Sequence, residues 1–300
     1  MSKMLEEEVN KEENNELLLN KSNEGAKIKK RKIVKGRGKT RLKIDEPALQ
    51  LEECVEVEKE VAQAVKTTRT KKPMAVLQSS YYDDLSLMEM GVDEVGRGPL
   101  FGRVYSAAVI LPKGEQFDHA SMKDSKRFHS KKKIEAVADY IKEHAIAWAV
   151  CYEDEKTIDE INILQASQSA MHKCIGEVLK KMRNKDDSFT TNNMRLLIDG
   201  NYFNSYLYYN KSIGKAEVVN SVCIEGGDNK YSAIAAASIL AKVERDKYIE
   251  DLCNDHPELK ERYSLDSNKG YGSKKHIDGI KEYGITVWHR RSFGICKDYM

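Results

Sequence analysis

The order of short apolar strands and amphipathic helices, which begins near residue 81, most constrains how this chain can fold. Two apolar runs, over 87–95 and 104–111, come first and have the length and composition of buried strands. The pattern then predicts a helix over 130–144 with Ser130 as its N-cap, a strand over 146–152, a helix over 158–182, strands over 194–199 and 218–224, and helices over 231–251 and 274–283. Strands followed by alternating helices and strands are typical of an α/β domain with a mixed sheet.

The chain before residue 81 has a different composition. It contains no aromatic residue, and its charges occur in blocks: residues 27–43 hold ten basic residues and no acidic one, between two acidic segments. Such a segment cannot bury enough apolar surface to fold, so we expect a disordered charged tail over 1–80 and a folded domain over 81–300. The basic block has three open interpretations: a nuclear localisation signal, a phosphate-binding arm, or a solvated segment with no specific role.

Cysteines and apolar runs exclude several classes of protein. The six cysteines are scattered and form no Cys-x-x-Cys pair, which argues against a zinc ribbon and a disulfide framework and favours reduced thiols inside a cell. The longest apolar runs, such as 145–152, are too short to span a bilayer, and residues 1–26 lack the apolar segment of a secretory signal. We expect no membrane association and a cytoplasmic location, with a nuclear location as the alternative if 27–43 is a targeting signal.

Four acidic residues follow apolar strands or stand in glycine turns. Asp93 and Glu94 close the first strand, Asp199 closes the strand over 194–199, and Asp228 follows two glycines after the strand over 218–224. Carboxylates suit hard cations such as Mg²⁺, and two such ions can activate a water and stabilise the leaving oxygen in phosphodiester hydrolysis. One difficulty is that neighbours in a strand point to opposite faces, so Asp93 and Glu94 can share a site only if the strand ends or twists there.

Several segments resemble the motifs of one known family, the type-2 ribonucleases H (ribonuclease HII). The resemblance begins with Gly-Val-Asp-Glu-Val-Gly-Arg-Gly-Pro-Leu at 91–100 and extends in order over roughly residues 88–295. The other matching segments lie at 124–126, 161–166, 198–201, 227–228, 235–243, 245–246, 269–273 and 289–293. Any one of these segments alone would be a weak signal, and the resemblance rests on finding all of them in the same order.

The resemblance implies a fold and an activity. The fold is a ribonuclease-H-like mixed sheet flanked by helices, with a helical C-terminal region. The activity is a metal-dependent endonuclease of DNA replication and repair. It cuts the RNA strand of RNA–DNA hybrids, and it nicks 5′ of single ribonucleotides embedded in duplex DNA, leaving a 3′-hydroxyl and a 5′-phosphate. The enzyme is expected to use two Mg²⁺ or Mn²⁺ ions and to act as a monomer with no obligate protein partner.

The resemblance also assigns roles to residues. The family's four metal-binding carboxylates match Asp93, Glu94, Asp199 and Asp228. The substrate-binding positions match the turn Gly96-Arg97-Gly98 at the ribose 2′-hydroxyl, Lys126 at a phosphate, and Tyr271, which stacks at the RNA–DNA junction. A 2′-hydroxyl distinguishes RNA from DNA, and glycines let a backbone approach it. The chain departs from the family at Gly226, where a lysine is usual, and at Gly102-Arg103, where Gly-Pro is more common.

Competing hypotheses and residue roles stay open beside this one. An inactive hybrid-binding module is disfavoured by the intact carboxylates, another two-metal nuclease by the Gly-Arg-Gly turn and Tyr271, and a subunit of a heterotrimeric enzyme by the motif at 289–293. For Arg97, both a phosphate contact and a structural salt bridge fit. Residues 289–291 fit either phosphate binding or capping of the C-terminal region. The position of Asp246 between Arg245 and Lys247 in a predicted helix favours a local ion pair as its role.

Overall fold

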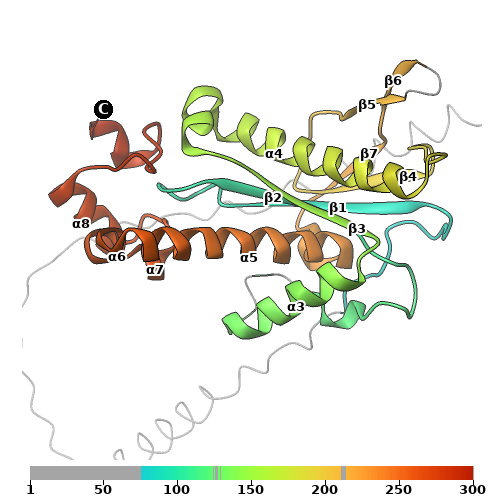
Figure 1. Cartoon of the computed structure of the whole chain (residues 1–300), viewed down its shortest axis with the longest axis horizontal. Coiled ribbons are helices and arrows are strands. Elements are labelled where there is room, and N and C mark those ends of the chain that lie inside the picture. Colours follow the sequence, from blue (N-terminus) through green and yellow to red (C-terminus); the bar gives the residue numbers. More distant parts are fainter. Residues whose placement is uncertain (1–75, 124, 126–127, 129, 211–213, 300) are drawn as a thin grey trace, which may run out of the picture. The chain divides into compact units, whose positions relative to one another are not determined.

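Five strands form one mixed sheet in the order β3-β2-β1-β4-β7 (Figure 1). The antiparallel half consists of β1 (Met88–Val95), β2 (Val104–Ile110) and β3 (Ala147–Glu153). The strands β4 (Met194–Asp199) and β7 (Ser221–Ile224) run parallel to β1. This is the mixed sheet that the sequence predicts, and β1 lies at its centre.

The computed structural model describes residues 76–299 except 124, 126, 127, 129 and 211–213. All of them belong to one compact unit, residues 73–300. The predictions for the charged tail over 1–75, including its basic block, lie outside the described residues. Residues 76–80 had been placed in that tail, yet Leu77 is buried and Gln78 exchanges backbone hydrogen bonds with Lys230 and Ser232.

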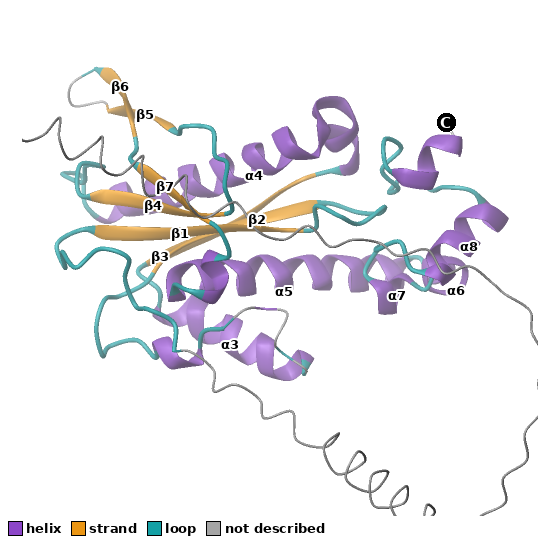
Figure 2. Cartoon of the chain, turned by 180° about the vertical axis from the view of Figure 1, so that it is seen from behind, coloured by secondary structure: helices purple, strands orange, loops and turns teal. Residues whose placement is uncertain are grey.

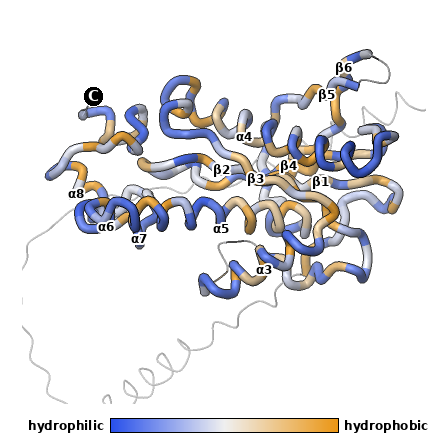
Figure 3. The backbone as a smooth tube through the Cα atoms, viewed as in Figure 1, coloured by the Kyte–Doolittle hydropathy of each residue, from blue (hydrophilic) through white to orange (hydrophobic). Residues whose placement is uncertain are grey.

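Helices cover both faces of the sheet (Figures 1 and 2). The long helix α4 (Glu155–Lys185) packs on one face, while α5 (Ser232–Asp255) and α3 (Lys131–His144) pack on the other. Each face of the sheet has its own apolar cluster, and Figure 3 shows hydrophobic residues along the strands between the helices. The fold is therefore the ribonuclease-H-like arrangement of a helix-flanked mixed sheet that we expected.

The first half of α5 packs unusually close to β1. Residues 232–241 are all buried, and most of them are alanine, serine or isoleucine, so this half of the helix is buried on every side. A Cβ atom added to Gly91 would lie 2.2 Å from the carbonyl carbon of Ala233, so only glycine allows this approach. The close packing brings the polar residues of α5 near the end of β1.

The C-terminal region is helical, as the resemblance implies. It contains α6 (Pro257–Tyr263), α7 (Leu265–Asn268), α8 (Lys274–Tyr283) and a final 3₁₀ segment, Gly294–Tyr299. These elements, with the second half of α5, surround the fully buried Phe101 in a separate apolar cluster. Two further 3₁₀ turns lie at His119–Ser121 and Gly227–Asn229.

Two local predictions were wrong in their bounds, and a third was confirmed only in part. The strand expected over 218–224 is broken, because Val218 ends a hairpin of β5 (Leu207–Asn210) and β6 (Lys215–Val218) that was not predicted. Ser130 occupies the N-cap position of α3, as predicted, but its side chain makes no capping hydrogen bond. The helix expected over 158–182 begins three residues earlier, where the Asp154 carboxylate accepts a hydrogen bond from the backbone N–H of Thr157 at 2.8 Å.

The helix α4 has a kink at Asn162, which lies in the left-handed region with φ 65°. Its side-chain oxygen accepts hydrogen bonds from the N–H groups of Leu164 and Gln165 at 3.0 and 3.1 Å. Asn162 thus acts as an N-cap for the second, longer part of α4.

Candidate active site

One pocket of about 270 Å³ gathers all of the described residues that the resemblance assigns to the site. It lies where the end of β1 meets α5 and the turns that follow β4 and β7. The residues that line it are Asp93, Glu94, Val95, Gly96, Arg97, Gly98, Ser125, Asp199, Asp228, Ser238, Lys242 and Tyr271.

Asp93 and Glu94 both line this pocket although they are neighbours in β1. Pairing between β1 and β4 stops at Val92 and Ile198, so β1 continues past the end of its parallel neighbour. Asp93 lies on the face of β1 that packs against α5, since Gly91 two residues earlier contacts Ala233. Glu94 reaches the pocket at the edge that β4 has left open. The difficulty posed by strand alternation is resolved by this unequal strand length.

Asp199 comes from β4, the parallel neighbour of β1, and Asp228 comes from the 3₁₀ turn that follows β7. Asp199 is the last residue of β4, and its carboxylate accepts a hydrogen bond of 2.6 Å from the backbone N–H of Gly227. Gly226 adopts a left-handed conformation with φ 61°, which turns the chain back toward Asp199 after β7. A lysine is usual in the family at position 226, and here a glycine makes the turn that places Asp228.

Negative charge accumulates in this pocket. Burial raises the pKa of Asp93 well above its usual range, and the nearby charges of Glu94, Asp199 and Asp228 raise it further. The pKa of Glu94 is also raised, mainly by burial, while Arg97 opposes the rise. Repulsion between carboxylates in a region of low dielectric favours the protonated form or a bound cation.

The donor set suits a hard divalent cation. The four acidic side chains offer carboxylate oxygens, and no thiol or imidazole lines the pocket. Within the described part of the chain, no three acidic, histidine or cysteine side chains are already arranged to hold a metal ion by themselves. Mg²⁺ does not need such a cage, because it is commonly held by one or two carboxylates together with waters and substrate phosphates.

The turn Gly96-Arg97-Gly98 forms one wall of the pocket. Arg97 makes an ion pair with Glu94, with 3.1 Å between Nη1 and Oε1, and half of its side chain remains exposed. The structural salt bridge is therefore present in this structure. The exposure also leaves Arg97 able to exchange Glu94 for a phosphate.

Arg290 bonds the main chain of this turn, and Arg245 bonds the segment that follows it. Arg290 is fully buried and donates to the carbonyl oxygens of Gly96, Arg97, Pro99 and Gly102 at 2.6–3.0 Å. Arg245 donates to the carbonyl oxygens of Phe101 and Arg103, both at 3.2 Å. Because its side chain is buried among these carbonyls, Arg290 holds the turn and is not available to phosphate. Of the two roles left open for 289–291, Arg290 has the structural one.

Tyr271 stands at the mouth of the pocket with about half of its surface exposed. A Cβ added to Gly98 would lie 3.6 Å from Cε1 of the Tyr271 ring, so the ring lies directly beside the turn. Lys126, the other predicted substrate contact, lies outside the described residues, although its neighbour Ser125 lines the pocket.

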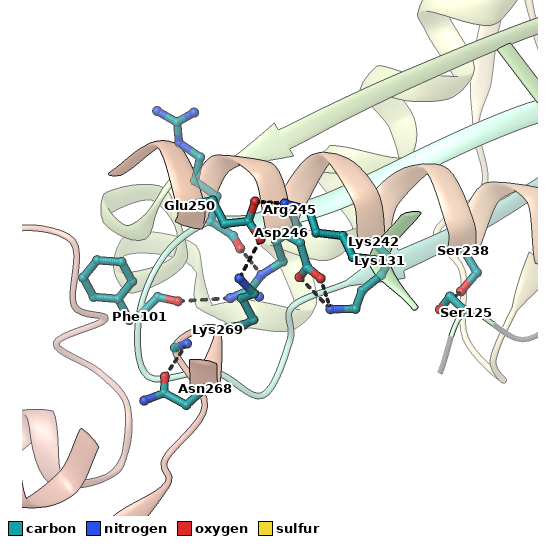
Figure 4. A network of polar contacts seen from close by, with 12 residues as sticks. Phe101, Ser125, Lys131, Ser238, Lys242, Arg245, Asp246, Glu250, Asn268 and Lys269 are labelled. Atoms are coloured by element: carbon teal, nitrogen blue, oxygen red, sulfur yellow. Dashed lines mark hydrogen bonds and ion pairs between the residues drawn. The ribbon is translucent and has the colours of Figure 1, made fainter. Parts of the chain in front are cut away.

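Ser125, Ser238 and Lys242 line the pocket although none of them was a predicted site residue. The Ser125 hydroxyl lies 3.0 Å from that of Ser238, and Lys242 donates to both carboxylate oxygens of Asp246 at 2.6 Å (Figure 4). The ion pair expected for Asp246 is real, but its partner is Lys242 and not Arg245 or Lys247. The available signal was the spacing of Ser238 and Lys242, which places them four residues apart on one helix face.

Comparison with known proteins defines the class. A family model described as ribonuclease HII matches residues 90–296. Ribonuclease HII of Bacteroides thetaiotaomicron is 41% identical over 217 residues, which is 72% of this chain and 94% of that protein. The enzyme of Neisseria meningitidis serogroup C is 39% identical over 216 residues, or 72% of this chain and 97% of that protein.

A solved structure shares the fold. The crystal structure of ribonuclease H2 from Pyrococcus horikoshii covers 71% of this chain and 97% of its own, with a TM-score of 0.51 and 21% identity. The fold and the family match define a ribonuclease H, an endonucleolytic hydrolase. Within that class, the chain belongs to the ribonuclease HII family.

Proposed function

We propose that this protein cleaves the RNA strand of RNA–DNA hybrids and nicks 5′ of single ribonucleotides embedded in duplex DNA, leaving a 3′-hydroxyl and a 5′-phosphate. One observation carries the proposal: four carboxylates, the Gly-Arg-Gly turn and Tyr271 share one pocket. The carboxylates suit hydrolysis of a phosphodiester, and the turn and the tyrosine suit recognition of a ribonucleotide next to DNA.

Asp93, Glu94, Asp199 and Asp228 would hold two Mg²⁺ or Mn²⁺ ions. When bound, such ions activate the attacking water and stabilise the leaving 3′-oxygen. The carboxylates orient this site through their own contacts. Asp199 is fixed by the Gly227 N–H, and the Asp93 main-chain carbonyl accepts a hydrogen bond of 2.8 Å from the Ser106 hydroxyl. The raised pKa of Asp93 means that cations and protons compete for this group, so activity should fall in acid.

Selection of RNA is proposed to lie in the turn. Arg290 occupies the carbonyls of Gly96 and Arg97, which leaves the N–H groups of the turn as candidates for contact with the ribose 2′-hydroxyl. DNA lacks this hydroxyl and would leave those groups without a partner in a desolvated site. Arg97 would leave Glu94 for a substrate phosphate when the cations bind.

Tyr271 is proposed to stack on the sugar or base that follows the ribonucleotide. Its ring is half exposed beside Gly98, and an aromatic face accepts any base. A deoxyribose next to the ribose would fit against the ring, whereas a second ribose would add a hydroxyl there. Tyr271 would therefore recognise the junction between the ribonucleotide and the DNA that follows it.

The decisive experiment uses the purified full chain with Mg²⁺ or Mn²⁺ and three duplexes: one with a single embedded ribonucleotide, a full RNA–DNA hybrid, and an all-DNA control. We expect cleavage of the first two alone, and loss of cleavage but not of hybrid binding in Asp199→Asn. Absence of cleavage with both metals would refute the proposal. It would also reject a stand-alone enzyme in favour of a subunit or binding module.

Partners, location and the charged tail remain proposals. We propose a monomer that binds hybrids and ribonucleotide-containing DNA and lies in the cytoplasm, since the relatives named above come from bacteria. No helix among the described residues is long and apolar enough to cross a membrane. If the basic block binds nucleic acid, deletion of residues 1–75 should flatten the salt dependence of hybrid affinity. If the salt dependence is unchanged, the basic block has either a targeting role or no specific role.

A further inference from the structure

Two buried histidines link the C-terminal region to Tyr271. His276 lies on α8 and His289 lies in the segment that follows it, and neither ring is exposed to solvent. Their Nε2 atoms are 3.1 Å apart. At one end of the pair, Nδ1 of His276 lies 2.9 Å from the carbonyl oxygen of Tyr271. At the other end, Nδ1 of His289 accepts a hydrogen bond of 2.9 Å from the backbone N–H of Thr286.

The two backbone groups at the ends of this hydrogen-bonded series determine where each ring proton lies. A carbonyl only accepts, so Nδ1 of His276 carries the proton and donates to Tyr271. A backbone N–H only donates, so Nδ1 of His289 is bare and its proton lies on Nε2. The Nε2–H of His289 therefore donates to the bare Nε2 of His276. Both ends require the same arrangement, in which both rings are neutral.

Burial supports the neutral state of both rings. It lowers the pKa of His276, and together with the neighbouring His276 it lowers the pKa of His289 to about 3. A further proton on either ring would set two N–H groups against each other at Nε2 or against the Thr286 N–H. In the series Thr286–His289–His276–Tyr271, only one assignment of protons to the ring nitrogens keeps all of these hydrogen bonds.

Hydrogen bonds at the Tyr271 carbonyl oxygen fix the orientation of the peptide group between Tyr271 and Gly272. This oxygen accepts from the Ser273 N–H at 2.7 Å as well as from His276. On the other side of Tyr271, the Gly270 carbonyl accepts from the N–H of Leu100, just beyond the Gly-Arg-Gly turn. The Tyr271 backbone is thus held between the turn and the histidine pair, while its ring projects into the pocket.

We infer that His276 and His289 are positioning residues, which fix the Tyr271 ring relative to the Gly96-Arg97-Gly98 turn and thereby set the preference for single ribonucleotides. Neither histidine lines the pocket, so both act through Tyr271. The inference rests on the proposed role of Tyr271. It adds that junction recognition needs the ring at a fixed place and not merely an aromatic residue at 271.

The test measures kcat and KM on the single-ribonucleotide duplex and on the full hybrid for His276→Ala, His276→Asn and Tyr271→Ala. An asparagine side-chain amide can occupy the place of Nδ1, so it can restore the donor to the Tyr271 carbonyl. We expect His276→Ala to reduce kcat/KM on the single-ribonucleotide duplex by about tenfold, as for a lost buried hydrogen bond, with a smaller loss on the hybrid. His276→Asn should recover part of the loss.

A double variant and a control complete the design. His276→Ala should add little to Tyr271→Ala, because both act through one ring. His172→Ala is the matched control, since His172 lies on α4 and bonds a backbone carbonyl, that of Asn204, at 2.8 Å outside the pocket. It should leave the substrate preference unchanged. Thermal melting of each variant separates misfolding from a change in preference.

Ring ¹⁵N chemical shifts in the full-length wild-type protein test the proton order without any activity measurement. We expect neutral rings with the proton on Nδ1 of His276 and on Nε2 of His289 at neutral pH. The opposite tautomers, equal loss on both substrates in His276→Ala, or additive effects with Tyr271→Ala would overturn the inference. If Tyr271→Ala itself fails to alter substrate preference, the proposed role of Tyr271 is refuted. If it does alter preference and His276→Ala does not, only the positioning inference fails.

Discussion

The guanidinium of Arg290 donates a hydrogen bond of 2.6 Å to the carbonyl oxygen of Gly96, although the two residues are 194 positions apart. Gly96 begins the turn beside the four carboxylates of the pocket, and Arg290 lies fully buried in the C-terminal region. The same side chain also reaches three more carbonyls of residues 97–102. The C-terminal region is therefore part of the active-site scaffold.

Replacement of Arg290 should destabilise the domain. Arg290→Met removes four contacts and leaves buried carbonyls without donors, so we expect the free energy of unfolding to fall by at least about 3 kcal/mol. Arg290→Lys should restore little, because an ammonium cannot reach carbonyls spread over this arc. Denaturant unfolding measures both. Arg291→Ala is the control, since that side chain is exposed, and equal stability of Arg290→Met and wild type would contradict the scaffold role.

The two glycines of the turn should tolerate alanine differently. Gly96 has φ 97°, and an added Cβ would lie 2.4 Å from Nε of the buried Arg245. Gly96→Ala should therefore lower both stability and activity. An added Cβ at Gly98 meets only the Tyr271 ring at an ordinary 3.6 Å, so Gly98→Ala should fold normally and lose activity through the substrate site. Melting temperatures and cleavage rates of the pair check this, and similar melting of both variants would disprove it.

Asp93→Asn should stabilise the metal-free protein at high pH while it abolishes cleavage. The folded state raises the pKa of Asp93, so the wild type loses stability as the pH rises through that value. Without divalent ions at about pH 8, we expect Asp93→Asn to melt higher, by roughly 2–4 °C per kcal/mol of relieved repulsion, and the difference to shrink near pH 4.

Mg²⁺ and a second variant control this measurement. Added Mg²⁺ should raise the melting temperature of the wild type more than that of Asp93→Asn, because only the wild type keeps the full ligand set. Asp246→Asn, which breaks an ion pair with Lys242, should bring no gain at any pH. A lower melting temperature for Asp93→Asn at high pH would argue against uncompensated charge in the pocket.

Lys242 should contribute to phosphate binding. It lines the pocket and is held by Asp246, one turn of α5 beyond Ser238. We expect Lys242→Gln to weaken hybrid binding and to reduce the slope of log affinity against log salt by about 1, as for one lost phosphate contact. Lys247→Gln is the matched control, because Lys247 is exposed on the same helix and does not line the pocket. Equal slopes in the two variants would exclude the contact.

Local pattern was sufficient for the order of the main elements and for the acidic residues of the site. Apolar runs that end at Asp93 and Asp199, and a glycine turn that precedes Asp228, are local signals, and the carboxyl ends of neighbouring parallel strands lie at the same edge of a sheet. The elements that were missed depend on context. The hairpin of β5 and β6 is largely exposed and has only four residues per strand, so its apolar pattern is weak.

Tertiary packing alone decided how the site is supported. Arg290 and Arg245 look like surface charges in the sequence, and His276 and His289 look like isolated helix and tail residues. Their roles come from burial against backbone groups far away in the chain, where a desolvated donor must find a carbonyl. Residue type and spacing determine which groups can do chemistry, because these are local properties. Long-range contacts, which no local pattern records, determine which other residues hold these functional groups in place.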